Sequence, residues 1–293
     1  MSLRVFAALV WETLRHARAT WLFWMLVGFN LFALAVVATA SVNTTGRVAL
    51  LAGLVPLDPD LRGGGALRES LQVALALGIT GVGGTIVAVI ASAGFIPEFL
   101  QPNSSSVLLV KPVPRWGLIL GRIAGVLAFI ATMAGIFVGG SWLLLGVRMG
   151  EWSPGYLYAW PLLMLQFLSV YSLSVLLGVL TRSSAACAFG SIVFWVICGG
   201  SNYAHHATLA MPIVADRQAE SAPALKWTTE AAYWALPKPV DVILMLDQAV
   251  NQGRWIREVP EFEHSAARRG FLPGLSVIST LVFALLMIGL AIH

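Results

Sequence analysis

Six stretches of the chain are apolar over about twenty residues each, and almost no charged side chain interrupts them. A helix needs about 20 apolar residues to cross the hydrocarbon core of a bilayer, where its backbone groups must bond within the segment. The sequence therefore predicts an all-α fold, that of a polytopic integral membrane protein. The predicted spans are residues 21–42, 71–96, 118–147, 158–180, 186–203 and 271–292.

Composition favours the same class. Hydrophobic residues make up 58% of the chain and charged residues only 11%, whereas a soluble domain carries about 25% charged residues. A surface with so little charge must face lipid, so the bilayer itself is an expected partner. The net charge is +4, but no basic cluster resembles a groove-binding patch, so we expect no binding of nucleic acid.

The whole chain, 1–293, is predicted to be one transmembrane domain. Residues 1–20 are amphipathic, with Val5, Ala8 and Leu9 on one side of a helical wheel. Such a segment is typical of a helix that lies along the membrane surface before the first span. Its polar end carries Glu12, Arg15, His16 and Arg18.

Residues 204–270 form the longest segment between predicted spans, and we expect it to be extracytoplasmic. Its part 227–250 is rich in aromatic residues and is broken at Pro237 and Pro239. This pattern predicts one or two interfacial helices near the outer face, which would serve as an outer gate or cap.

Orientation follows from the basic residues, which favour the cytoplasmic side in short loops. With both termini in the cytoplasm, the inner segments hold more Lys and Arg than the short outer loops, although Arg268 and Arg269 argue the other way. The inner residues are Arg4, Arg15, Arg18, Lys111, Arg115, Arg122 and Arg182. We therefore expect a multi-pass protein of the cell membrane with both termini inside.

Motifs for chemistry are missing from the sequence. A phosphate-binding P-loop needs a Gly-rich turn before a lysine, but Lys111, Lys226 and Lys238 follow Val, Leu and Pro. We expect no catalytic residue, no cofactor and no enzyme activity of its own. Acidic residues and lysines are also missing from the centres of the spans, which disfavours an ion-coupled carrier.

His205 and His206 are the most suggestive ionisable pair. Adjacent histidines point apart on a helix, but Asp216 or Asp241 could come close to them in the fold. An interfacial histidine pair is favoured over a metal site, so no metal is predicted. Cys187 and Cys198 are eleven residues apart, roughly 16 Å along a helix, which is too far for a disulfide.

Polar and small residues within the spans mark contacts between helices. Asn30 and Gln166 are predicted to bond between helices or to line a substrate route. Small residues four apart let another helix pack closely, either within the subunit or between subunits. The third span carries such residues at Gly117, Gly121, Gly125, Gly135 and Gly139.

The stretch 96–122, between the second and third spans, has the most specific sequence. Glu98 opens it, Leu108 and Leu109 offer an apolar patch, and a rigid basic turn follows. A plain loop needs no such combination, so residues 97–117 are predicted to dock on a partner at the cytoplasmic face. The basic turn is Lys111-Pro112-Val113-Pro114-Arg115, and Gly121-Arg122 begins the third span.

This stretch resembles the membrane subunits of type-2 ATP-binding-cassette exporters, especially small six-span permeases akin to the nitrous-oxide-reductase maturation permease. In that family the loop opens with Glu and continues through a Leu pair, Pro, a basic residue, and a small and a basic residue. The residues that match in order are Glu98, Leu108, Leu109, Pro112, Arg115, Gly121 and Arg122. One departure is Asn103-Ser104-Ser105-Ser106, which replaces the usual small pair.

The resemblance implies a permease subunit that forms a substrate pathway with a second, identical or different, permease copy. Separate ATPase subunits would dock on the loop through Glu98, Leu108, Leu109, Lys111 and Arg115, and the direction would be export. Arg122 would fix the start of the third span by reaching for lipid headgroups. The alternative is a membrane-embedded enzyme or an assembly factor with its site in 204–270.

Overall fold

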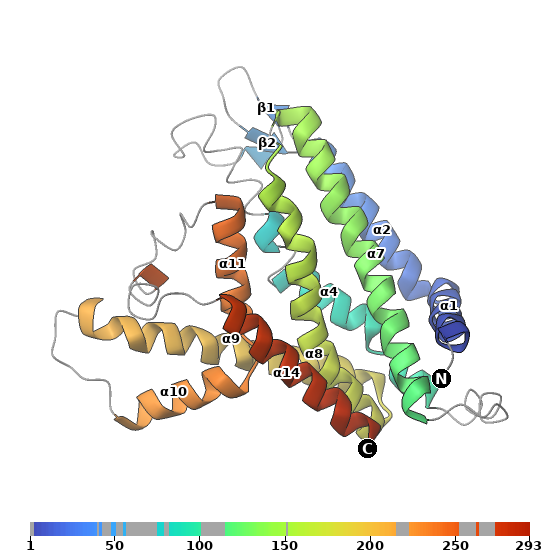
Figure 1. Ribbon diagram of the computed structural model, residues 1–293. Helices are drawn as coiled ribbons and strands as arrows, with labels where there is room; N and C mark the ends of the chain where they lie inside the picture. The colour runs from blue at the N-terminus through green and yellow to red at the C-terminus, as the bar shows by residue number, and fades with distance from the viewer. Residues whose placement is uncertain are drawn as a thin grey trace.

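The computed structural model describes residues 3–39, 41–42, 48–50, 55–56, 75–78, 82–100, 115–150, 152–214, 223–251, 262–263 and 273–293. Helices dominate this part of the chain, which confirms the predicted all-α, polytopic membrane class (Figure 1). Five helical segments are long and apolar enough to cross a membrane: Leu75–Phe99, Trp116–Arg148, Pro154–Thr181, Ser184–Leu209 and Pro273–Ile292.

A sixth span results if the pair Phe6–Ala19 and Phe23–Ala38, bent by 76°, counts as one. This pair consists of α1 (Leu3–Ala19) and α2 (Trp21–Ala38), with Thr20 between them. The Thr20 hydroxyl donates to the Ala17 carbonyl at 2.7 Å, and the Phe23 amide donates to the Thr20 carbonyl at 3.2 Å. The chain therefore turns sharply at Thr20 without leaving these backbone groups unpaired.

The remaining helices follow in chain order. They are α4 (Val82–Ser92), α5 (Phe95–Phe99), α7 (Arg115–Met149), the 3₁₀ helix η2 (Pro154–Tyr158), α8 (Ala159–Thr181), α9 (Ser184–Val214), α10 (Pro223–Ala235), α11 (Pro239–Asn251) and α14 (Pro273–Ile292). In Figure 1 the two termini lie near the start of α7, at the end of the bundle opposite the strands.

A small antiparallel sheet, which the sequence analysis did not foresee, follows α2. Its strands are β1 (Ser41–Val42), β2 (Val48–Leu50) and β3 (Val55–Pro56), in the order β1-β2-β3. Ser41 pairs with Ala49, and Ala49 pairs with Pro56. Strands of two or three residues leave the helical class of the fold unchanged.

The fifth predicted span, 186–203, is shorter than the helix that the structure forms there. Helix α9 continues to Val214, so it carries Asn202, His205 and His206 on its own turns. The prediction ended the span at these residues because they are polar. The structure buries all three instead, with Asn202 and His206 bonded to α11, so the helix has no reason to end there.

Helix α8 forms the centre of the core. It packs against α4, α7, α9 and α14, and it buries the stacked rings of Phe167 and Tyr171, whose centroids are 5.1 Å apart. At its start the Tyr156 hydroxyl, on η2, lies 2.8 Å from the Ser141 hydroxyl of α7. The Tyr156–Ser141 contact thus links η2 to α7, whereas the buried Tyr171 hydroxyl has no hydrogen-bond partner among the described residues.

Two glycines of α7 allow α1 to approach closely. A Cβ at Gly121 would lie 2.9 Å from Leu9, and one at Gly125 would lie 2.5 Å from the Thr13 Cβ. The small-residue seam foreseen in this span therefore packs a helix of the same chain. Gly139, further along α7, has nothing within 4 Å of a built Cβ and plays no part in this contact.

Gly125→Ala and Gly139→Ala add the same methyl group to one helix with opposite expected effects. At Gly139 the gain in helix propensity should raise the free energy of unfolding by up to about 1 kcal/mol. At Gly125 the methyl collides with Thr13, so overpacking should lower it by about 1–3 kcal/mol. SDS titration in mixed micelles measures both, and equal effects would contradict the close α1–α7 contact.

Candidate functional site

The sequence-predicted coupling loop is only partly described. Leu108, Leu109, Lys111 and Pro112 lie outside the described residues. Arg115 begins α7, and its backbone alone is described. What the structure does describe are the two ends of the loop, at Glu98 in α5 and at the first turns of α7.

Glu98 pairs with the surface helix α1. Its carboxylate lies 3.3 Å from His16 Nε2, and both side chains are nearly half exposed. An exposed ion pair contributes at most about 1 kcal/mol, and this one is charged only when His16 is protonated. The contact therefore holds the start of the loop on α1 weakly.

Arg122, which is predicted to reach for lipid headgroups, contacts two neighbouring helices. Its Nη1 donates to the Thr13 hydroxyl of α1 at 3.3 Å, and its guanidinium lies 5.0 Å from the centre of the Phe99 ring on α5. The side chain is thus engaged with two neighbouring helices rather than extended to lipid headgroups. The reason is the Gly121–Gly125 seam, which brings Thr13 within its reach.

These contacts define one unit, the α1–α5–α7 junction, made of His16, Thr13, Glu98, Phe99 and Arg122. Both described ends of the coupling loop are tied to α1 through it. A displacement of the loop would therefore be transmitted first to the surface helix.

The two polar residues proposed for a substrate route are separated. Asn30 Nδ2 donates to the Met133 carbonyl at 3.0 Å, so it links α2 to α7, and its side chain lines a cavity. Gln166 is fully buried in α8 and does not line that cavity. Asn30 thus makes the predicted bond between helices.

A second polar cluster lies among α9, α10, α11 and α14, and its centre is the fully buried carboxylate of Asp241. His206 Nε2 and Asn202 Nδ2 of α9 bond to one carboxylate oxygen at 2.7 and 3.1 Å. The Tyr233 hydroxyl of α10 and the Ser276 hydroxyl of α14 donate to the other at 2.9 and 2.6 Å. We call these five residues, with Lys238, the Asp241 cluster.

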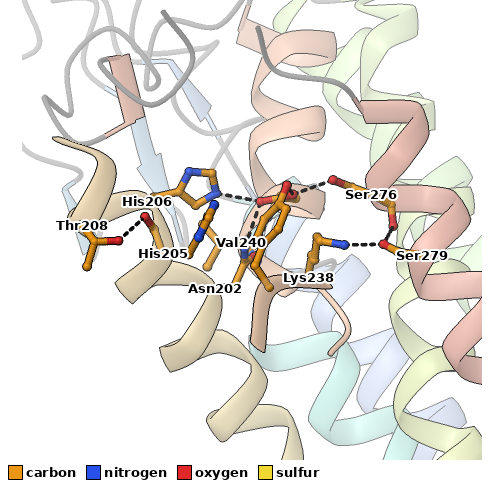
Figure 2. Close-up of polar contacts among 10 residues, drawn as sticks. Asn202, His205, His206, Thr208, Lys238, Val240, Ser276 and Ser279 are labelled. Carbon is orange, nitrogen blue, oxygen red and sulfur yellow. Dashed lines mark hydrogen bonds and ion pairs between the residues drawn. The ribbon is translucent and has the colours of Figure 1, made fainter. Parts of the chain in front are cut away.

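Local sequence explains why Asp241 sits there. Pro237 and Pro239 end α10 and start α11, which places Asp241 in the first turn of α11. The amide groups of Val240 and Asp241 would lack partners at this helix start, and both donate to Asn202 Oδ1, at 3.0 and 3.1 Å. Asn202 thus caps α11 from a different helix, as the close-up shows (Figure 2).

Lys238 is the buried cation of the cluster. Its ammonium group donates to the Ser279 hydroxyl of α14 and lies 4.5 Å from the centre of the Tyr233 ring and 5.3 Å from that of Trp234. The other neighbour of Tyr233 is His205, whose ring stacks on it at 4.1 Å. Figure 2 shows the hydrogen bond from Lys238 to Ser279 and the one from the Ser279 hydroxyl to the Ser276 carbonyl.

The Asp241 carboxylate affects the pKa of Lys238, whereas hydrogen bonds and the charge of His206 set the pKa of Asp241. Burial lowers the pKa of Lys238, and the nearby Asp241 carboxylate acts against that shift. Burial alone would raise the pKa of Asp241, but hydrogen bonds from His206, Ser276 and Asn202, with the charge of His206, bring that pKa below its usual value. Asp241 is therefore held as a carboxylate.

This arrangement suits a structural clamp better than acid–base chemistry. A carboxylate has about four acceptor positions, and four side chains already donate to the two oxygens of Asp241. Within the described residues, no group of three or more His, Cys, Asp or Glu is placed to hold a metal ion, and Asp216 lies outside them. The cluster joins four helices through one anion.

Sequence reasoning anticipated one contact of this cluster, the approach of Asp241 to the histidine pair. It missed Asn202, Tyr233, Lys238 and Ser276. A usable signal was the spacing of Asn202 and His206, four residues apart and hence on one face of an apolar helix, together with a charged Pro-Lys-Pro-Val-Asp turn. No protein-family model, curated protein or solved structure matches the chain.

Asp241→Leu removes the carboxylate near which both His206 and Lys238 are buried, whereas after Lys238→Met the carboxylate keeps His206 as its ion-pair partner. Asp241→Leu should lower the free energy of unfolding by about 3–5 kcal/mol and Lys238→Met by less, and the double variant should lose less than the sum of the two. SDS titration measures all three. Lys226→Met, the same change at an exposed lysine of α10, should stay within about 0.5 kcal/mol. Strict additivity would contradict charge compensation.

Acid should weaken the clamp in a defined window. Because the pKa of Asp241 is lower in the folded chain than in the unfolded chain, its contribution is complete above the unfolded value of about 4 and is lost as the pH falls further. The stability difference between wild type and Asp241→Asn should therefore shrink below about pH 4. His205, Lys238 and Tyr233 are present in both proteins, and the ion pair with His206 is lost together with the carboxylate, so the difference reports Asp241 and that ion pair. A constant difference down to pH 2 would exclude this account.

Proposed function

We propose that this chain is the permease subunit of an ATP-binding-cassette transporter, working as an exporter in the cell membrane with both termini in the cytoplasm. A separate ATPase subunit would dock on the loop between the second and third spans. The observation that carries the proposal is the α1–α5–α7 junction, where both described ends of that loop are tied to one amphipathic helix.

The physical argument concerns what such a junction can transmit. ATP binding in a partner shifts a permease between states only through contacts that differ between those states. The loop from Glu98 to Arg115 combines an acid, an apolar patch and a rigid basic turn. Glu98 at its start meets His16 of α1. Arg122, seven residues beyond Arg115 in α7, meets Thr13 of α1, so force on the loop would reach α1 and α7 together.

The position of the termini supports the proposed orientation. Both termini and the first turn of α7 lie at one end of the bundle (Figure 1). The basic residues of α1, Arg4, Arg15 and Arg18, are exposed and belong to this end. Such exposed arginines favour the cytoplasmic face, where they meet anionic headgroups.

Helix α9 supports the expected second permease copy. It is the least buried of the five described spans within the single chain. A second copy would cover this open face; the lower hydropathy of α9 comes instead from Asn202, His205 and His206, which are buried within the chain. Its uncovered face carries Phe189, Val193, Val196, Ile197 and Tyr203.

Co-purification tests this proposal. The tagged chain, extracted from its native host in mild detergent, should bring down an ATP-binding-cassette ATPase in a complex of two permeases and two ATPases, which native mass spectrometry counts. Arg115→Glu or Glu98→Lys should reduce the recovered ATPase at least roughly tenfold, because like charges across an interface cost several kcal/mol.

Arg148→Glu supplies the control, because it reverses an exposed charge at the other end of the same helix, α7. This variant should retain the ATPase, and all variants should reach the membrane equally. If no such ATPase appears in several detergents, or if Arg115→Glu retains it, the proposal fails.

A further inference from the structure

A cavity of about 240 Å³ lies between α2, α7, α8 and the helical residues 75–78 and 82–88. It exists because many residues around it have little or no side chain. Where larger residues would have filled the space, the wall presents Ala33, Gly78, Gly83, Gly84, Ala88 and Ala134. The cavity therefore results from small residues that α2, α7 and the segment Leu75–Phe99 bring together.

The cavity is apolar and opens sideways. Among the described residues that line it, none is charged, and Asn30 is the single polar side chain. The Nδ2 group of Asn30 donates to the Met133 carbonyl, so this side chain forms part of the cavity wall between α2 and α7. At the mouth Phe29 is 56% exposed, whereas Ala134 and Leu163 on the floor are 7% and 4% exposed.

The position of the cavity along its helices shows which molecules surround its opening. Asn30 lies midway along α2, Met133 midway along α7, and Val87 midway along the segment Leu75–Phe99. The mouth therefore faces the middle of the bilayer, where the available molecules are hydrocarbon chains. An empty cavity forfeits dispersion contacts along its whole lining, and a cavity of about 150 Å³ with apolar walls already binds benzene.

We propose that this cavity is a binding site for one hydrocarbon chain, inserted sideways from a bilayer lipid between α2 and the helical residues 82–88 until it reaches Ala134 and Leu163. A charged guest is disfavoured because no described residue that lines the cavity is charged, and the one polar residue among them, Asn30, offers a single unpaired acceptor, Oδ1. The inference rests on the proposed function only where it makes such a lipid the cargo; the binding site itself requires no ATPase.

Photochemical cross-linking tests the site. The purified chain is placed in phosphatidylcholine nanodiscs that contain a phosphatidylcholine with a diazirine at the middle of one acyl chain. Adducts on Phe29, Val87 and Met133 should saturate at a low fraction of the probe. Adducts on Leu285, which is exposed on α14, should rise in proportion to the probe. At a low fraction of the probe, the adduct yield at the cavity residues should exceed that at Leu285 about tenfold, which corresponds to a binding preference of about 1.4 kcal/mol.

Two variants fill the cavity from opposite walls, Ala134→Phe on α7 and Ala33→Phe on α2. Either should bring the cavity adducts down to the Leu285 level. Ile136→Phe adds an aromatic ring on the exposed face of α7 and should leave them unchanged. Thermal unfolding identifies any variant that fails to fold. If one of the two fails, the variant on the opposite wall provides the test.

Three results would overturn the proposal. In the first, cavity adducts rise in proportion to the probe, as for ordinary surrounding lipid. In the second, folded Ala134→Phe and Ala33→Phe keep the wild-type adducts. In the third, Phe29, Val87 and Met133 form no adducts at any fraction of the probe while Leu285 does. Each of these would leave the co-purification of an ATPase unaffected, and a failed co-purification would leave the cross-linking unaffected.

Discussion

Polar groups in this molecule must complete their hydrogen bonds without water, and that requirement explains most of its architecture. Serines and threonines inside the helices return their hydroxyls to carbonyls of the preceding turn, as Ser92 and Thr132 do. Asn30 uses its amide to bind a carbonyl of the neighbouring helix. The same requirement makes Asp241 a hub, because a buried anion is stable only when every acceptor position is used.

The two polar assemblies of the chain differ in strength, and this difference has a mechanical meaning. The Asp241 cluster is buried and joins α9, α10, α11 and α14 through one carboxylate. The α1–α5–α7 junction depends on an exposed His16–Glu98 contact and on one bond from Arg122. Under the proposed function, the weak junction is where a partner acts, and the clamped helices provide the fixed frame.

Much of the helical plan followed from apolar runs alone, because length and hydropathy decide which segments can cross hydrocarbon. The break at Thr20 also followed from the amphipathic pattern before it. What could not be foreseen depended on contacts far apart in sequence. Asn202 looked like the end of a span, but it caps α11 thirty-eight residues away, and so α9 continues past it.

The same limit applies to the candidate sites. Arg122 looked like a headgroup anchor because a basic residue at a helix start usually is one. Its contact with Thr13 depends on how closely Gly125 admits α1, which no single segment reveals. The cavity is similar: Ala33, Gly83 and Ala134 come from three helices, and each looks ordinary within its own helix.

Helix α7 connects the two proposals physically. Near its start it meets α1 through Gly121 and Gly125, and at its middle it forms a wall of the cavity with Met133 and Ala134. Helix α2 reaches the same cavity from the bend at Thr20, so α1 is joined to both walls. Under the proposed function, a shift of α1 against α7 would reach the Asn30–Met133 contact through the bend at Thr20. Under the two proposals, the bend at Thr20 therefore lies between the loop on which an ATPase docks and the cavity that a hydrocarbon chain occupies.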